Sequence, residues 1–477
     1  MQLQIPLVSS AGPLFRQVYG GLRHAILSGA LRGGEKQPST RDLAQQLDVS
    51  RTVVLLAYEQ LVSEGFAVGR RGSGTYISSG TALIKSASVE ETAQLRLARF
   101  GSRAAAAHSK VSFPDPQARP LPYDFAYGRS DLETFPLAAW RRILLKCVRT
   151  ASAAALDYGP ASGDSELRES IAAHLRRARA VSCDPSQVII VNGSQQALDL
   201  IARVLIERGD SVGVEDPSYQ GVIAVLRAAG ARILPVPVDR EGLDTARLPK
   251  GVRVMFVTPS HQFPTGAILP LSRRLALLEW ARRCNAALVE DDYDGEFRYD
   301  GQPLESLQGL DRDSRVIYVG TFSRTMFSAL RMGYLVAPRS LVPAFTTAKW
   351  LCDRHTPRLE QRALAEFISS GQYERYLRRA RRRSATRREV LLDSIDRYLK
   401  DRVDVAGDGA GAHVVLWSKE RIVEDMVITA AASRGVGVYG ITPYRLTPAP
   451  QSGLMLGYSR LTETQIREGI RRLSKVF

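Results

Sequence analysis

The sequence predicts an α/β protein in two parts: a small, mostly helical N-terminal domain and a large domain built on a mostly parallel sheet. Two observations carry this prediction. Within the first 78 residues, short amphipathic helices precede a glycine-rich segment, and beyond residue 120 short β-branched runs alternate with helical stretches. A chain of 477 residues is also too long for a single hydrophobic core. We therefore divide it into a domain at 1–78, a linker at 79–120 with some local helix, and a second domain at 121–477.

The first domain opens with an amphipathic helix. Leu14, Val18, Leu22 and Ile26 recur at steps of four residues, and Gly29 suits the end of such a helix. One apolar face at this spacing predicts a helix that packs against others.

Two further helices are marked by their N-terminal caps. Ser39 is a natural N-cap, with Asp42 three residues later as a weak capping box, and Ser50 caps a helix that we expect to run to about Glu64. Residues 66–77 then carry the glycines of a two-stranded hairpin. Three short helices followed by a hairpin predict a winged helix-turn-helix.

This architecture predicts double-stranded DNA as the partner, because the third helix presents its N-terminal residues to base edges and the hairpin suits phosphates. The residues that we expect to face DNA are Ser39, Thr40, Arg41, Ser50, Arg51, Thr52, Arg70 and Arg71. The net charge of +16 favours a polyanionic partner, although residues 1–80 hold only eight Arg and Lys against five Asp and Glu. A winged helix used for protein contact is the alternative.

The order of short motifs in this domain resembles the GntR family of bacterial regulators. The motifs are Pro-Ser-x-Arg-x-Leu-Ala, Ser-Arg-Thr-Val, Ala-Tyr-x-x-Leu and Gly-Ser-Gly-Thr-Tyr, and they fall at family spacing within residues 12–78. One departure is Gln37, which occupies a position that is usually leucine. We expect this glutamine to loosen the packing before the second helix.

The bulk composition excludes several classes of protein. There is no run of about 18 apolar residues, so we expect no membrane span, and the first residues lack the pattern of an export signal. The four cysteines lie far apart without metal-type spacing. We therefore predict a cytoplasmic protein with reduced thiols and no metal site.

The second domain shows the alternation that is typical of a parallel sheet with helices on both faces. The predicted strands are 188–191, 212–215, 233–238, 252–258, 287–290 and 316–319, with helices such as 195–207 and 271–284 between them. Functional residues of such a sheet lie at the carboxyl ends of its strands.

One of these strand ends departs from a known pattern. Residues 319–334 resemble the pyridoxal-phosphate (PLP) attachment stretch of fold-type I aminotransferases, but Arg324 stands where those enzymes have a lysine. A covalent bond to PLP needs an amine that can lose its proton, whereas a guanidinium stays protonated (pKa above roughly 12) and is a poor nucleophile. We therefore expect PLP to be held without a covalent bond, and we expect no catalytic residue and negligible turnover.

The other groups that such a pocket requires also follow strands. Gly193 and Ser194 open a helix and can hold a phosphate, Asp291 suits a pyridinium nitrogen, Tyr293 suits a phenolic oxygen, and Tyr219 can stack on a ring. The cofactor-binding residues that we predict are Tyr158, Gly193, Ser194, Tyr219, Asp291, Tyr293, Thr321, Ser323, Arg324 and Arg331.

In combination these residues resemble MocR-type regulators, a GntR subfamily that fuses a winged helix to a fold-type I domain. The resemblance covers nearly all of residues 121–477. It implies a homodimer, simple or domain-swapped, in which Tyr158 reaches the PLP phosphate of the partner subunit. It also places Phe263 where aminotransferases commonly have an asparagine, with His261 and Gln262 lining the same pocket.

The sequence therefore predicts a transcriptional regulator whose large domain senses PLP or a related amino-acid or phosphorylated metabolite. Three interpretations of the pocket stay open. PLP is held without a covalent bond, or Arg324 holds another phosphorylated or carboxylated metabolite, or the site is vestigial and the domain only dimerises. The alternative function is a PLP-dependent aminotransferase with an accessory DNA-binding segment.

Overall fold

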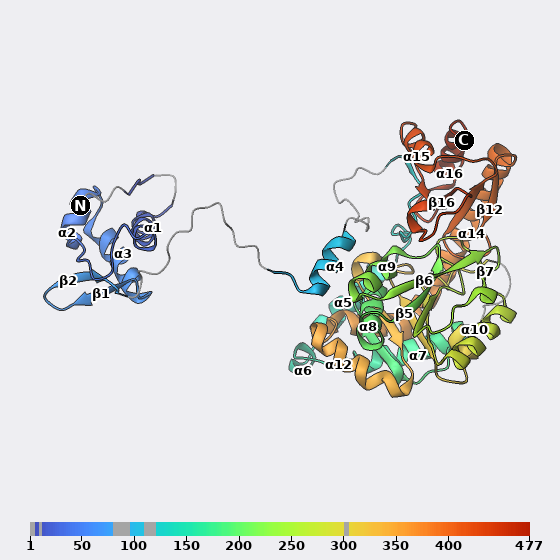
Figure 1. Ribbon diagram of the computed structural model, residues 1–477, viewed down its shortest axis with the longest axis horizontal. Coiled ribbons are helices and arrows are strands. Elements are labelled where there is room, and N and C mark those ends of the chain that lie inside the picture. Colours follow the sequence, from blue (N-terminus) through green and yellow to red (C-terminus); the bar gives the residue numbers. More distant parts are fainter. Residues whose placement is uncertain (1–4, 9–11, 80–95, 109–120, 300–304) are drawn as a thin grey trace. The chain divides into compact units, whose positions relative to one another are not determined.

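The computed structural model describes residues 5–8, 12–79, 96–108, 121–299 and 305–477. The contacts divide the chain into two units, one up to Arg96 and one from Leu97 onward, which Figure 1 shows with their element labels. Most of the predicted linker, at 80–95 and 109–120, lies outside the described residues.

The first unit has the three helices and the hairpin that the sequence predicts. They are α1 (Leu14–Leu27), α2 (Thr40–Gln46), α3 (Arg51–Ser63), β1 (Ala67–Arg70) and β2 (Gly74–Ile77). Leu22, Leu43 and Leu61 from the three helices meet Ile77 of the hairpin in one buried cluster. This shared core fixes the hairpin beside the helices and confirms a winged helix-turn-helix.

Gln37 is buried in this unit, at the position where the sequence departs from the family pattern. It is 4% exposed, and within residues 12–79 and the rest of the described chain neither polar atom of its side-chain amide has a hydrogen-bond partner. A buried amide without a partner loses its hydration without compensation. The structure therefore shows the cost of Gln37 in the hydrogen bonds that its amide lacks.

We expect Gln37→Leu to raise the free energy of unfolding of the first unit by about 1–3 kcal/mol, because it removes the unpaired amide from the core. Hydrogen exchange of α2 and α3 in the full-length chain measures this gain as slower exchange. Gln45→Leu on the exposed face of α2 is the control and should leave the exchange unchanged. Faster exchange in Gln37→Leu would contradict this account of the site.

The second unit is built on an eight-stranded sheet in the order β4-β11-β10-β9-β8-β5-β6-β7. Its strands are β4 (Val188–Val191), β5 (Ser211–Asp216), β6 (Arg232–Asp239), β7 (Gly242–Leu243), β8 (Val254–Val257), β9 (Ala287–Asp292), β10 (Val316–Thr321) and β11 (Gly333–Val336). β11 runs antiparallel between β4 and β10, and β7 is an antiparallel edge strand. The other six strands are parallel to one another, as predicted.

Helices cover both faces of this sheet (Figure 1). One face packs against α5 (Leu137–Arg149), α7 (Ser165–Arg179), α10 (Leu271–Cys284) and α13 (Arg358–Ser369), and the other packs against α8 (Ser194–Leu205), α9 (Gln220–Ala229) and α12 (Val342–Asp353). Alternate residues of one strand face opposite layers, so Tyr318 contacts the first set and Val319 the second. Burial on both sides explains why these strands are continuous apolar runs.

The C-terminal part forms a second, antiparallel sheet in the order β12-β13-β16-β15. Its elements are α14 (Gln372–Leu399), β12 (Val403–Ala406), β13 (His413–Ser418), α15 (Glu424–Ala432), β15 (Tyr439–Gly440), β16 (Gly453–Gly457) and α16 (Glu463–Leu473). Phe125, which precedes the central sheet in the sequence, packs into the core of this part.

A helix inside the predicted linker packs on the second unit. α4 (Arg99–His108) lies beside α9 (Figure 1), and the Arg103 guanidinium donates hydrogen bonds to the carbonyl oxygens of Ala228 and Ala229 at 2.8 and 3.3 Å. Those carbonyls end α9, where a cation is favoured. Among the described residues, no helix is both long and apolar enough to cross a membrane. The four cysteines are free thiols.

Candidate functional site

The register of the central sheet brings the predicted pocket residues to one edge. Gly333 of β11 pairs with Val191 of β4 on one side and with Thr321 of β10 on the other. Val319 of β10 pairs in turn with Asp291 of β9. The loops that follow β4, β9 and β10 therefore open at the same edge of the sheet.

One end of this edge suits an anion. Gly193 has φ +82°, which favours glycine, and α8 begins at the next residue. The Arg331 guanidinium donates to the carbonyl oxygen of Asn192 at 3.0 Å and lies so close that a Cβ on Gly193 would stand 3.0 Å from it. The Ser323 hydroxyl is buried without a hydrogen-bond partner in the described chain. A helix N-terminus, a guanidinium and a free hydroxyl together can hold a phosphate.

Asp291 lies near the end of β9, beside Val319 of β10, and one of its carboxylate oxygens is unpaired. Its Oδ1 is buried and has no hydrogen-bond partner among the residues that the structure describes. Burial and the nearby Asp292 raise the pKa of Asp291 to about 7, and Arg324 opposes that shift. A buried carboxylate of this kind lacks a cationic or N–H partner, as a pyridinium nitrogen would supply.

Aromatic rings cluster beside this edge of the sheet. Phe263 is 4% exposed and packs edge-on against Tyr219 and Tyr293, with ring centroids 5.9 and 5.8 Å apart. The Tyr219 hydroxyl donates to Oε1 of Gln195 at 3.2 Å. Burial and Asp294 raise the pKa of Tyr293 well above its usual value, so this phenol remains a hydrogen-bond donor. The rings form an apolar wall that suits a planar ligand.

Arg324 extends from the end of β10 along this wall. Its guanidinium carbon lies 5.7 Å from the ring centre of Tyr293 and 6.0 Å from that of Tyr127. Gly128 leaves room for it, because a Cβ there would stand 2.1 Å from Nη1. Within the described parts of the chain, the Arg324 guanidinium forms no ion pair, and it lines a cavity together with Asp131. A guanidinium that faces a cavity and forms no salt bridge can bind an anionic ligand there.

The structure thus gathers Gly193, Ser194, Tyr219, Asp291, Tyr293, Thr321, Ser323, Arg324 and Arg331 around one edge of the sheet. Tyr158 lies apart at the surface, 73% exposed, with the Arg354 guanidinium over its ring. Gln262 does not offer its amide to the pocket, since that amide bonds Glu215, Pro217 and Thr265.

Sequence reasoning missed several pocket residues. Tyr127 and Gly128 come from the start of the second unit, and Asp294 and His413 line the same cavity as Arg324. No motif marks them, because they come together only through the packing of segments that lie far apart in sequence.

The predicted DNA-facing residues gather at two helix N-termini and on the hairpin. The Arg51 guanidinium donates to Oγ1 of Thr40 at 3.1 Å, which joins the start of α3 to the start of α2. The hydroxyls of Ser39 and Ser50 cap these helices by accepting backbone N–H groups. Arg41, Thr52, Arg70 and Arg71 are exposed, with the Arg70 guanidinium 4.6 Å from the Tyr76 ring centre.

The two units match different protein families. Residues 14–77 match the gntR family of bacterial regulatory proteins, and residues 124–473 match aminotransferase class I and II. The probable rhizopine catabolism regulatory protein MocR of Rhizobium meliloti is 36% identical over 469 residues, which cover 98% of this chain and 94% of that protein. The HTH-type pyridoxine biosynthesis transcriptional regulator PdxR of Corynebacterium glutamicum is 32% identical and covers 95% and 93%.

Solved structures resemble the second unit. LysN, the alpha-aminoadipate aminotransferase of Thermus thermophilus, complexed with N-(5'-phosphopyridoxyl)-L-leucine, is 30% identical with a TM-score of 0.68, over 74% of this chain and 91% of that one. Kynurenine aminotransferase of Pyrococcus horikoshii, in complex with PMP, is 26% identical with a TM-score of 0.71, over 80% and 95%. The mostly parallel sheet of the second unit is therefore a fold-type I sheet.

Proposed function

This chain belongs to the GntR family of transcriptional regulators, in the MocR type, and from this premise we propose that its second unit binds PLP without a covalent bond and thereby controls DNA binding. The winged helix is the DNA-binding part of the regulator. The observation that carries the proposal is the buried Oδ1 of Asp291, which has no hydrogen-bond partner in the part of the chain that the structure describes and feels the charge of Arg324, since the groups for PLP are kept while the amine is replaced.

Each end of the cofactor has a counterpart in the pocket. The α8 N-terminus at Gly193 and Ser194, with Arg331, suits its phosphate, and Asp291 suits its ring nitrogen. Bound PLP would supply an aldehyde and an electron-accepting ring. Arg324 cannot form an imine with that aldehyde, because its guanidinium stays protonated. The residues of this chain therefore only bind and orient the cofactor. The name of the Corynebacterium glutamicum relative, a regulator of pyridoxine biosynthesis, supports an effector of the B6 type.

Helix α9 offers a physical path from the pocket to the linker. It begins directly after Tyr219, and its C-terminus receives Arg103 of α4. A ligand that orders Tyr219 therefore acts on the helix against which the linker segment packs. Such a ligand controls DNA binding by the winged helix only if its affinity differs between two conformations of the protein.

We also propose a homodimer, simple or domain-swapped. Large apolar side chains are exposed on α5, on α6 (Ala153–Leu156) and on α12, namely Leu137, Leu145, Val148, Leu156, Trp350 and Leu351. The exposed Tyr158 follows α6, where a second copy would cover it. An apolar surface of this kind supports an interface between subunits.

The function is tested by operator binding with and without PLP. PLP should change the affinity of the full-length protein for its operator, and Arg324→Met should weaken this response if Arg324 orients the ligand. A chain whose operator affinity does not respond to PLP, although PLP binds, would contradict control by this cofactor.

We expect Arg51→Ala to weaken specific operator binding by about 1–3 kcal/mol, because Arg51 stands at the N-terminus of the recognition helix. Arg70→Ala should instead reduce the salt slope of binding by about 1, as expected for one phosphate contact. Fluorescence anisotropy at several salt concentrations measures both. Arg16→Ala on the exposed side of α1 is the control, and equal losses in all three variants would argue against this DNA face.

The alternative function, an aminotransferase with a DNA-binding segment, predicts measurable transamination. Proton abstraction at the substrate α-carbon normally falls to the lysine that Arg324 replaces. We therefore expect no keto acid when the protein is incubated with PLP and amino donors. Keto-acid formation at an enzymatic rate would favour the enzyme.

A further inference from the structure

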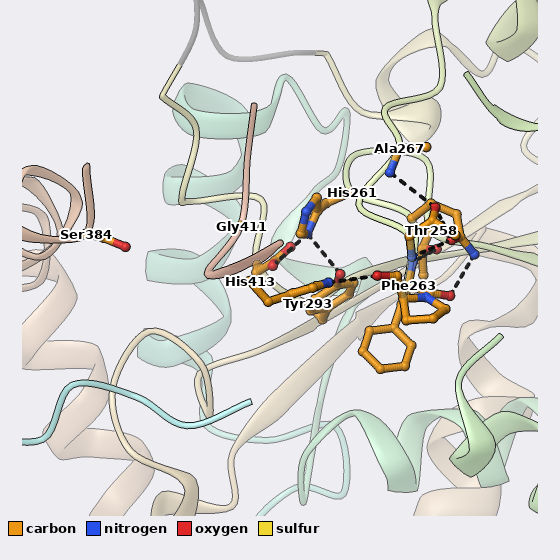
Figure 2. Close-up of polar contacts among 12 residues, drawn as sticks. Thr258, His261, Phe263, Ala267, Tyr293, Ser384, Gly411 and His413 are labelled. Atoms are coloured by element: carbon orange, nitrogen blue, oxygen red, sulfur yellow. Dashed lines mark hydrogen bonds and ion pairs between the residues drawn. The ribbon is translucent and has the colours of Figure 1, made fainter. Parts of the chain in front are cut away.

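Three metal-ligating side chains meet beside the pocket, and none of them has a role in the proposed cofactor contacts. His261 follows β8, Asp294 follows β9, and His413 begins β13. One ligand atom from each lies within 4.8 Å of the others, and Nδ1 of His261 is 2.9 Å from Oδ2 of Asp294. All three residues are at least 96% buried. Figure 2 shows His261 and His413 beside Tyr293 and Gly411.

The three side chains keep unused ligand positions. Nε2 of His413 donates to the carbonyl oxygen of Pro264 at 3.0 Å, which leaves the lone pair of Nδ1 available. Oδ1 of Asp294 and Nε2 of His261 are buried, and neither has a hydrogen-bond partner within the described segments.

The backbone around the cluster is shaped for close approach. Gly411 has φ +72°, and a Cβ there would stand 2.1 Å from Cε1 of His261 and 2.6 Å from Oδ2 of Asp294. Only glycine lets the segment before β13 lie against this pair. Asp294 and His413 also line the cavity of Arg324, so one side of the cluster is open to water or a ligand.

We propose that His261, Asp294 and His413 bind one divalent transition-metal ion of the zinc class. Two imidazoles and a carboxylate suit such an ion, whereas Mg²⁺ and Ca²⁺ prefer oxygen ligands alone. With Zn–N and Zn–O distances of about 2.0–2.2 Å, the ligand atoms of a tetrahedral site stand about 3.4 Å apart. In the structure, one ligand atom from each of the three residues lies within 4.8 Å of the others, so the separations shorten by up to about 1.4 Å when the side chains hold the ion.

The hydrogen bond from His413 to Pro264 is the outer contact that orients a metal-bound imidazole. The fourth position falls to a water molecule from the cavity that Asp294 and His413 line. Since two ligands follow strands of the central sheet and the third begins β13 of the C-terminal sheet, the ion would tie the two sheets together beside the cofactor pocket. This proposal does not depend on PLP binding.

The test is Co²⁺ binding to the full-length, PLP-free protein after treatment with a chelator. We expect one Co²⁺ per chain with the visible absorption of a four- or five-coordinate site, and displacement by Zn²⁺. His413→Gln and Asp294→Asn should each weaken Co²⁺ binding by at least about 100-fold, since even the outer partner of a metal ligand is worth about 10–100-fold.

The matched control is His174→Gln, which alters another buried histidine that lies on α7. It should leave the Co²⁺ spectrum and stoichiometry unchanged. Circular dichroism of each variant shows whether it is folded. If one ligand variant does not fold, the other ligand variant and the Co²⁺ spectrum of the unmodified protein test the proposal. Absence of stoichiometric Co²⁺ uptake by the unmodified protein would overturn the proposal, and so would full retention of uptake in both ligand variants.

Discussion

Borohydride reduction of the PLP-loaded protein should leave no cofactor attached, whereas the Arg324→Lys variant should retain one phosphopyridoxyl group per chain. Reduction fixes only a carbon–nitrogen double bond, and the protonated guanidinium of Arg324 cannot form one with the PLP aldehyde. A lysine at this position lies on the same wall as Tyr293 and near Asp291, where burial lowers the pKa of an amine toward reactivity. The expected effect is all or none, and intact-protein mass spectrometry measures it.

Lys349 provides the control for this experiment. It is a fully buried amine on α12, paired with Asp353 at 2.5 Å. Lys349→Arg should change neither the unmodified protein nor the Arg324→Lys variant. Reduction that attaches PLP to the unmodified chain would show that another amine reaches the cofactor, and the non-covalent proposal would fail. An Arg324→Lys variant that binds PLP without attaching it would contradict the placement of residue 324.

The strands and the first unit could be predicted because their signals are local. The caps at Ser39 and Ser50 and the apolar runs of the six parallel strands are properties of neighbouring residues, and their ends in the structure fall within two residues of those predicted. β11 was not predicted as a strand. Its four residues form part of a motif, and its place between β4 and β10 depends on pairing with residues far away in sequence.

The residues of the pocket also differ in whether local sequence predicts them. Asp291 and Ser194 could be predicted because each follows an apolar strand directly, at the carboxyl edge of a parallel sheet. The approach of His413 to Asp294 could not be predicted, since it depends on how the C-terminal sheet packs against the central one. The sequence also predicted no metal site, because cysteine and histidine spacing reveals only ligands that are close in sequence.

The carboxyl group of Asp291 should make the PLP-free protein less stable as the pH rises. Its pKa is about 7 in the folded protein, because of burial and Asp292, against an ordinary value of 3.8. Between these values the unfolded chain has lost the proton that the folded chain keeps, so stability is full below about pH 4 and falls as the pH rises toward 7. A difference of about three pKa units corresponds to roughly 4 kcal/mol at most.

Asp291→Asn should therefore flatten this part of the pH dependence and make the PLP-free protein more stable than the unmodified one above pH 7. It should also weaken PLP binding by about 10- to 100-fold, because a hydrogen bond to a charged group contributes about 1.5–3 kcal/mol. Thermal unfolding across pH 4–8 and a PLP titration measure the two effects.

Glu290→Gln is the matched control, since burial raises the pKa of Glu290 to about 7 while its carboxylate accepts the backbone N–H groups of Leu307 and Gln308, away from the pocket. That control should alter the pH dependence and leave PLP affinity unchanged, whereas an Asp291→Asn variant that binds PLP as tightly as the unmodified protein would show that this carboxylate does not face the pyridine nitrogen.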